Sequence, residues 1–412
     1  MTRARPIPHQ FHANPDWATL PLFDRKGWKR VRFGDVVRML KEQVDPVAEG
    51  VERYVAGEHM ETENVHIRKW GNVGEGYLGP AFIRRFRKGQ VLYGSRRTYL
   101  KKVAVADWDG VTANTTFVLE AVEGKLLQEL LPWLMLSERF TQHSIQESKG
   151  STNPYINFPD IAKFEFDIPP IDLQRRIADI LLAADQVTEQ WNHTLAIEKE
   201  TAEAFAKSAF HGVSIEKAGS QIVTKRLGDA FIVCTGGTPA RANPEFWGGS
   251  VPWIKTGEVN YEDIYDSEEK ITDLGYKKSA TKLIPADAVL MALYGQGPTL
   301  GRVAQLRVKA TVNQACAAIL PSNMFDMRYL FYYLASQYKQ IRRLARGASQ
   351  PNISVAIVKD FIVPAPPLAE QAEIVDELQK YEQTQKNIMG FIVRSQKLVM
   401  GIANAFIFAT QK

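Results

Sequence analysis

Residues 171–210 read IDLQRRIADILLAADQVTEQWNHTLAIEKETAEAFAKSAF, follow Pro169 and Pro170, and contain neither proline nor glycine. This stretch predicts one long α-helix, because proline is tolerated just before a helix or in its first turn but breaks a helix interior. Residues 368–407 read LAEQAEIVDELQKYEQTQKNIMGFIVRSQKLVMGIANAFI and follow Pro366 and Pro367. A second long helix is therefore predicted 197 positions after the first.

Both stretches carry apolar residues at alternating steps of four and three, which is the spacing of the contact seam in a coiled coil. A lone amphipathic helix of about 60 Å would leave that seam exposed to water. We therefore expect the two helices to pack on each other as an antiparallel coiled coil. The seam residues are Ile177, Leu181, Trp191, Leu195, Phe205, Ile374, Leu378, Tyr381, Ile388, Ile392, Val399, Ile402 and Phe406.

The duplication extends beyond the helices into the segments that precede them. Ten of the 32 positions between residues 150 and 181 are identical to the residue 197 positions later. Before each long helix, short apolar runs broken by glycine indicate a β-rich region, here called a head. An internal repeat of this length decides the fold class.

The predicted fold is α+β, with two β-rich heads separated by two long helices and related by an internal pseudo-twofold repeat. The expected boundaries are residues 1–28 for an N-terminal arm, 29–168 for the first head, 169–212 for the first long helix, 213–365 for the second head and 366–412 for the second long helix. Because the two helices keep register while the heads share only scattered positions, the heads are expected to do the same job on different targets.

Composition limits the functional classes only mildly. The chain has 412 residues, a formal net charge of +5 and an apolar fraction of 45%, as expected for several globular domains. Its two cysteines lie 82 positions apart with no neighbouring metal-ligand pattern, so we expect reduced thiols and no metal site. No apolar run is long enough to cross a bilayer, and we expect a cytoplasmic protein.

A basic segment in the first head points to nucleic acid. Eight cations fall between residues 84 and 102 with no acidic residue among them, and such clusters neutralise phosphates. The alternative is an ordinary solvated strand face. The candidate residues are Arg84, Arg85, Arg87, Lys88, Tyr93, Arg96, Arg97, Tyr99, Lys101 and Lys102, and their counterparts in the second head are Tyr294, Gln296, Thr299 and Arg302.

Two polar loops at equivalent positions add further candidates. They contain Lys149, Ser151, Thr152 and Asn153 in the first copy and Arg346, Ser349 and Gln350 in the second. Such loops can contact phosphates or read adenine, although an ordinary proline-terminated turn explains the pattern equally well. No catalytic residue is predicted, because the glycine-rich segments match neither a P-loop nor a dinucleotide fingerprint.

The paired signature Pro-Pro-φ-x-x-Gln-x-x-Ile, residues 169–177 and 366–374, resembles the specificity subunit of type I restriction-modification systems. The resemblance covers the chain beyond the N-terminal arm. It implies a non-catalytic subunit in which each head, called a target recognition domain in that family, reads one half of a bipartite double-stranded DNA sequence. Since the two heads differ, we expect a non-palindromic target.

The resemblance also implies partners. Two methyltransferase (modification) subunits would dock on the helices and methylate adenine with S-adenosylmethionine, which they and not this chain would bind, and restriction subunits would join that core. The alternative is a standalone coiled-coil DNA-binding scaffold or regulator without methyltransferase partners.

Overall fold

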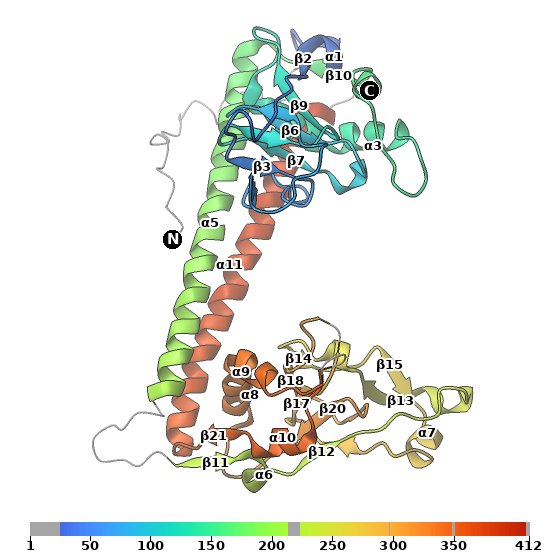
Figure 1. The fold of residues 1–412 in the computed structure, drawn as a ribbon, viewed down its shortest axis with the longest axis vertical. Coiled ribbons are helices and arrows are strands. Elements are labelled where there is room, and N and C mark those ends of the chain that lie inside the picture. Colours follow the sequence, from blue (N-terminus) through green and yellow to red (C-terminus); the bar gives the residue numbers. More distant parts are fainter. Residues whose placement is uncertain (1–24, 213–222, 296, 348–350, 409–412) are drawn as a thin grey trace. The chain divides into compact units, whose positions relative to one another are not determined.

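The computed structural model describes residues 25–212, 223–295, 297–347 and 351–408. Most of the predicted N-terminal arm therefore lies outside the described residues. The chain forms two compact units, residues 1–193 with 389–412 and residues 194–388. The long helices α5 (Ile171–Gly212) and α11 (Leu368–Phe408) each contribute one part to each unit (Figure 1).

The head of the first unit contains two four-stranded sheets. The first is antiparallel with the order β2-β9-β6-β7, and the second has the order β4-β3-β8-β5 with β3 and β8 parallel. The strands are β1 (Lys29–Arg32), β2 (Val37–Leu40), β3 (Arg53–Val55), β4 (Gly71–Asn72), β5 (Arg84–Phe86), β6 (Val91–Gly94), β7 (Val103–Val105), β8 (Gly110–Thr112), β9 (Thr116–Ala121) and β10 (Glu165–Ile168). The helices are α1 (Phe33–Val36), η2 (Thr98–Leu100), η3 (Gln128–Leu130), α2 (Leu131–Leu136), α3 (Glu138–Gln146) and α4 (Phe158–Ile161).

The head of the second unit repeats this plan. Its sheets have the orders β12-β20-β17-β18-β14 and β15-β13-β19-β16, with β13 parallel to β19. The strands are β11 (Thr224–Arg226), β12 (Val233–Thr235), β13 (Trp247–Ile254), β14 (Asp263–Ile264), β15 (Glu269–Ile271), β16 (Leu283–Ile284), β17 (Val289–Ala292), β18 (Val303–Leu306), β19 (Ala310–Val312), β20 (Cys316–Ile319) and β21 (Ile362–Pro364). The helices are α6 (Leu227–Ala230), η4 (Pro244–Phe246), η5 (Thr256–Glu258), α7 (Asp273–Lys277), α8 (Met327–Ser336), α9 (Tyr338–Arg343) and α10 (Val355–Asp360).

The two heads correspond strand by strand. The order β2-β9-β6-β7 matches β12-β20-β17-β18, and the parallel bridge between His66 and Val105 stands where β14 pairs with β18. In both heads the strand before the long helix pairs with the first strand, β1 with β10 and β11 with β21. The duplicated β-rich fold predicted from the sequence is confirmed.

Antiparallel packing of the long helices is also confirmed, and each unit contains its own part of it. In the first unit the rings of Trp191 and Phe391 stack with centroids 4.7 Å apart. In the second unit the ring centroids of Phe205 and Tyr381 lie 5.7 Å apart. As the residue number rises along α5 it falls along α11, which is the relation of antiparallel helices.

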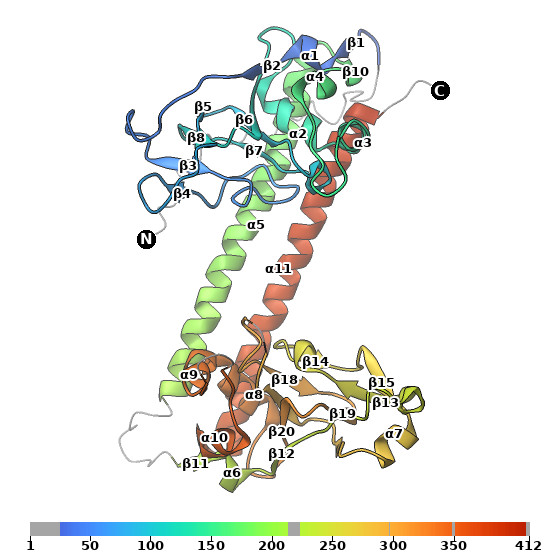
Figure 2. The ribbon, with the colours of Figure 1, turned by 45° about the vertical axis from the view of Figure 1, so that its right-hand side comes forward.

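Each helix also enters the core of a head. Ile177 and Leu181 belong to the core of the first unit together with Val399 and Ala403. Figure 2 shows the end of α11 beside α3 of the first head, where the Glu138 N–H donates to the Asn404 side chain. In the second unit, Ile374, Val375 and Leu378 share a core with Phe210. The seam residues with described side chains are all buried or half-buried, and the side chain of Phe406 lies outside the described set.

Shortening Phe391 tests the stacked pair in the first unit. We expect Phe391→Ala to lower the free energy of unfolding by about 1 kcal/mol, because an aromatic pair contributes beyond its buried area. Thermal unfolding of the full chain, followed by circular dichroism, measures the change. Val393→Ala is the control, since Val393 is similarly exposed but has no stacked ring, and its effect should stay within about 0.5 kcal/mol. Equal losses in both variants would contradict a role for the stack.

The glutamine of the Pro-Pro signature has a structural role that the sequence did not reveal. Gln174 is 1% exposed, accepts a hydrogen bond from the Leu127 backbone N–H, and donates to the carbonyls of Lys125 and Pro169. Gln371 is 0% exposed and makes the same three kinds of bond, to Asp326, Met324 and Pro366. This glutamine therefore joins the start of each long helix to its head.

Candidate nucleic-acid interface

Two segments that the sequence placed more than 50 residues apart lie side by side in the first unit. The backbone of Arg96 forms an antiparallel bridge with Tyr155, which is bridged in turn to Lys149. The Arg97 N–H donates to the Pro154 carbonyl at 2.7 Å, and the Ile156 N–H donates to the Ser95 carbonyl at 2.9 Å. The basic turn and the polar loop therefore form one continuous surface, which we call the turn–loop surface and define as residues 96–99 and 149–155.

The turn has a conformation that projects its side chains. Arg97 and Lys101 flank the short helix η2 and have φ values of 49° and 45°, in the left-handed region that non-glycine residues rarely adopt. Such backbone conformations are concentrated at functional sites, although they also occur in ordinary turns. Tyr99, on η2, is 52% exposed.

Arg96 and Arg97 are the two arginines of the turn–loop surface. Both side chains are exposed. Among the described residues, neither guanidinium has a carboxylate partner. An exposed, uncompensated guanidinium can donate two parallel hydrogen bonds to a phosphate or to a guanine edge.

Several other cations of the basic segment are paired within the first unit. Arg85 contacts Glu49 at 2.7 Å and Glu42 at 3.6 Å, and Arg87 contacts Glu42 at 2.8 Å. The hydrogen bond that Arg87 donates to the Glu42 carboxylate raises the pKa of its guanidinium. The segment contains no acid of its own, but the fold supplies acids from distant positions.

Lys101 and Lys102 are also engaged. The Lys101 ammonium lies 2.7 Å from Glu63 and 3.2 Å from Glu138, and the Lys102 ammonium donates to the Gly57 carbonyl. Burial lowers the pKa of Lys101, but its hydrogen bonds to Glu63 and Glu138 raise it above the ordinary value overall. Arg84 is half-buried in β5, whereas Lys88 is exposed.

Tyr93 does not lie on the surface. It is 2% exposed, and its hydroxyl is hydrogen-bonded to the Ser144 hydroxyl inside the core. Burial raises the pKa of Tyr93 to about 12. Its place in β6 turns the ring inward, so the DNA contact predicted for Tyr93 is replaced by a role in packing.

The polar loop contributes mostly exposed groups. Ser151, Thr152 and Asn153 are exposed, and so is Tyr155 at 40%, a residue that the sequence analysis did not select. The Lys149 ammonium contacts the Asp160 carboxylate at 2.9 Å. The hydrogen bond that Lys149 donates lowers the pKa of Asp160, so this carboxylate partly balances the Lys149 charge.

The second head repeats two of these backbone contacts but carries other side chains. Arg346 is bridged to Asn352, and the Ile353 N–H donates to the Leu293 carbonyl at 2.8 Å. Tyr294 is 45% exposed and Arg346 is exposed. Gln296, Ser349 and Gln350 lie outside the described residues.

Two further candidates of the second head are less accessible. Thr299 is half-buried, and Arg302 donates to the Asn260 side chain from above the Tyr261 ring. The carbonyls of Gly297 and Pro298 accept hydrogen bonds from Arg342 and Tyr338 of α9. Helix α9 therefore fixes the loop that matches the basic turn of the first head.

The described residues contain no group of three or more His, Cys, Asp or Glu side chains arranged to hold a metal ion. Within the same part of the chain, no helix is both long and apolar enough to cross a membrane. Cys234 and Cys316 are free thiols.

Comparison with known proteins identifies the family. Residues 25–199 and 220–390 each match the family described as type I restriction modification DNA specificity domain. The chain belongs to the family of type I restriction-modification specificity subunits. The two matched ranges correspond to the two repeats recognised from the Pro-Pro signature.

Curated members of the specificity-subunit family align over different lengths. The Escherichia coli EcoR124I/EcoR124II specificity subunit is 31% identical over 184 residues, which is 43% of this chain and 45% of that protein. The chain thus spans less than half the length of that relative. The Haemophilus influenzae HindI specificity subunit is 23% identical over 399 residues, covering 78% of this chain and 86% of that protein.

Solved structures show the specificity-subunit fold as well. One chain from a structure on the assembly and conformational transition of the type I system has a TM-score of 0.60 at 18% identity, covering 93% of this chain and 99% of that one. The S subunit from M. genitalium has a TM-score of 0.55 at 14% identity, covering 95% and 99%. At these identities the likeness concerns the fold alone.

Proposed function

We propose that this specificity-subunit family member reads a bipartite, non-palindromic DNA sequence, one half with each head, without catalysing a reaction itself. The observation that carries the proposal is the pair of heads with one strand topology but unlike side chains on equivalent surfaces. Arg96 and Arg97 stand in the first head where the second has a glycine-rich loop around Gly295. Two heads with the same strand topology but different exposed side chains suit two different half-sites.

In the first head, the turn–loop surface is the proposed contact. Arg96, Arg97 and Tyr99 would contact bases or phosphates. Ser151, Thr152 and Asn153 would contact the DNA backbone. Arg84, Lys88 and Lys149 would add to the surrounding positive potential, as would the paired Arg85, Arg87, Lys101 and Lys102 more weakly. In the second head the proposed contacts are Tyr294, Gln296, Thr299, Arg302, Arg346, Ser349 and Gln350.

The proposed partners are two methyltransferase subunits docked on α5 and α11, joined by restriction subunits in a cytoplasmic complex. S-adenosylmethionine would be bound by the methyltransferase subunits, which would methylate adenine. Exposed apolar side chains on the helices, including Val187, Ile197 and Leu398, supply surface suited to protein contact. One relative is the specificity subunit of a type I restriction enzyme, and one similar solved structure concerns complex assembly of the type I system.

Co-expression with candidate type I methyltransferase subunits, followed by sequencing of methylated adenines in the host, tests the proposal. We expect a stable complex with two methyltransferase subunits and methylation at one two-part sequence. Exchanging residues 29–168 for the first head of a relative should change one half of that sequence and leave the other half unchanged. Changes in both halves, or in neither, would contradict the assignment of one half to each head.

The rival function is a standalone DNA-binding scaffold or regulator. The same co-purification separates the two. A chain that binds DNA as a homodimer and never retains a methyltransferase subunit would support the rival and overturn the proposed complex.

A further inference from the structure

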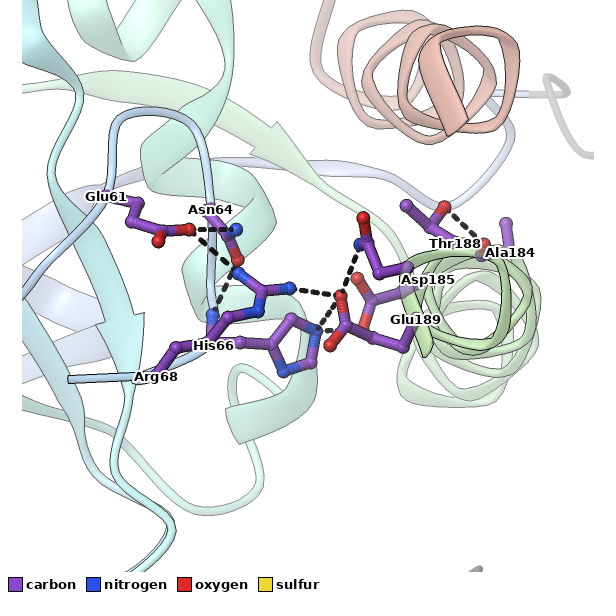
Figure 3. Close-up of polar contacts among 9 residues, drawn as sticks. Glu61, Asn64, His66, Arg68, Ala184, Asp185, Thr188 and Glu189 are labelled. Carbon is purple, nitrogen blue, oxygen red and sulfur yellow. Dashed lines mark hydrogen bonds and ion pairs between the residues drawn. The ribbon is translucent and has the colours of Figure 1, made fainter. Parts of the chain in front are cut away.

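A polar cluster of residues outside the turn–loop surface joins the first head to α5. The His66 ring nitrogen Nε2 lies 2.9 Å from the Asp185 carboxylate and 3.9 Å from that of Glu189 (Figure 3). Arg68 pairs with Glu189 on one side and with Glu61, at 2.9 Å, on the other. We call these five residues the head–helix brace.

Hydrogen bonds within the head loop hold the brace in place. Glu61 accepts a hydrogen bond from Asn64, whose own carbonyl accepts the His66 backbone N–H at 3.0 Å. The side chains of His66 and Asp185 are only 19% and 18% exposed. The contact is therefore a preformed element of the first unit, and its two halves come from a head loop and from α5.

An equivalent contact occupies the second unit. His66 and Asp185 correspond, 197 positions later, to Asp263 and Glu382. There Arg328 bridges the two carboxylates, at 2.7 Å from Asp263 and 2.9 Å from Glu382. The two units thus share a head-to-helix contact at matching positions. In the first unit His66 makes it, beside the Arg68–Glu189 pair, and in the second unit Arg328 makes it.

The two cations differ in chemistry. The Arg328 guanidinium keeps its charge at every physiological pH, and it lies on the rings of Phe331 and Tyr332. A histidine changes charge within that range, and when neutral it pairs less strongly with a carboxylate. We propose that the brace holds the first head to α5 in a protonation-dependent way, so that rising pH loosens the first head but not the second.

The charged groups facing His66 support this assignment. From α5 these are Asp185 and Glu189, and from the head loop they are Arg68, Glu61 and Glu63; Gln396, which α11 contributes to the same small cavity, is uncharged. Burial lowers the pKa of His66, but the hydrogen bond and charge of Asp185, together with Glu189, raise it above the ordinary 6.5 overall. The cavity of about 30 Å³ beside the ring is large enough to admit water and hence protons.

The direction of the effect follows from that raised pKa. Because folding raises it, the stabilisation is complete below the unfolded value of about 6.5 and is lost as pH rises through the folded value. The first head is therefore held most firmly in mildly acidic solution.

Hydrogen exchange of the full chain without DNA tests the proposal. Between about pH 6 and about pH 9, exchange in peptides covering residues 61–69 and 185–192, corrected for the intrinsic rate, should rise about fivefold, the difference between a charged and a neutral hydrogen bond. Peptides around Asp263 and Glu382 serve as the internal reference and should stay level. An exchange rate in the first unit that does not change with pH, or the same rise in both units, would overturn the proposal.

Variants assign the response to one side chain. In His66→Gln, the peptides covering residues 61–69 and 185–192 should exchange fast at every pH, so their exchange should no longer depend on pH. In His193→Gln, which replaces an exposed histidine of α5, the pH dependence should remain. A retained response in His66→Gln would exclude His66 as its source. Because no DNA or partner is present, this experiment can fail or succeed independently of the proposed function.

Discussion

Replacing Arg96 and Arg97 together with alanine is expected to lower the affinity for DNA about 100-fold when the first half-site is intact. Two direct base or phosphate contacts of about 1–3 kcal/mol each account for a loss of this size. The second half-site should be read as before, because the second head has its own contacts. Fluorescence anisotropy with duplexes that carry either half-site altered measures both effects.

The matched control is the double variant Arg85→Ala and Arg87→Ala. It removes the same formal charge from the same segment, but both guanidinium groups already pair with Glu42 or Glu49. We expect a loss of less than about tenfold, together with a shallower dependence on salt. Equal losses in the two double variants would show that total charge, and not the turn–loop surface, governs binding.

Replacing Gln371 with leucine is expected to lower the free energy of unfolding by about 3–5 kcal/mol. The change leaves the Asp326 N–H and the carbonyls of Met324 and Pro366 without their partner in a fully buried place. Urea unfolding of the full chain, with hydrogen exchange to locate the loosened segment, measures the loss.

Gln379→Leu provides the comparison for this variant. Gln379 lies on the same helix but is exposed, so its replacement should change stability by less than about 0.5 kcal/mol. The equivalent change Gln174→Leu should act on the first unit as Gln371→Leu acts on the second. A small loss of stability in both Gln371→Leu and Gln174→Leu would show that the glutamine does not attach the helix to the head.

The parts of this protein that follow local rules could be predicted from its sequence. Helix boundaries follow from proline placement and apolar periodicity, and the duplication follows from identities at a fixed spacing. The predicted start of the first long helix, immediately after Pro169 and Pro170, agrees with α5 beginning at Ile171. The helix boundaries need only neighbouring residues, and the duplication needs only a comparison of the sequence with itself.

The parts that depend on contacts between distant residues could not be predicted. The acids that neutralise Arg85 and Lys101, such as Glu49 and Glu138, come from outside the basic segment because the sheets bring them there. The same holds for the adjacency of Arg96 and Tyr155. The sequence predicts Tyr93 as a DNA contact because it lies between cations. Its strand turns the side chain inward, which leaves it only 2% exposed.

The division of the long helices between the two units has a consequence for synthesis. Residues 194–388 form the second unit as one continuous segment, whereas the first unit is completed by residues 389 onward. Val399 and Ala403, which belong to the first unit's core, leave the ribosome more than 200 residues after Leu181. The head that is made first is therefore finished last, and until then its core lacks the contacts of Val399 and Ala403.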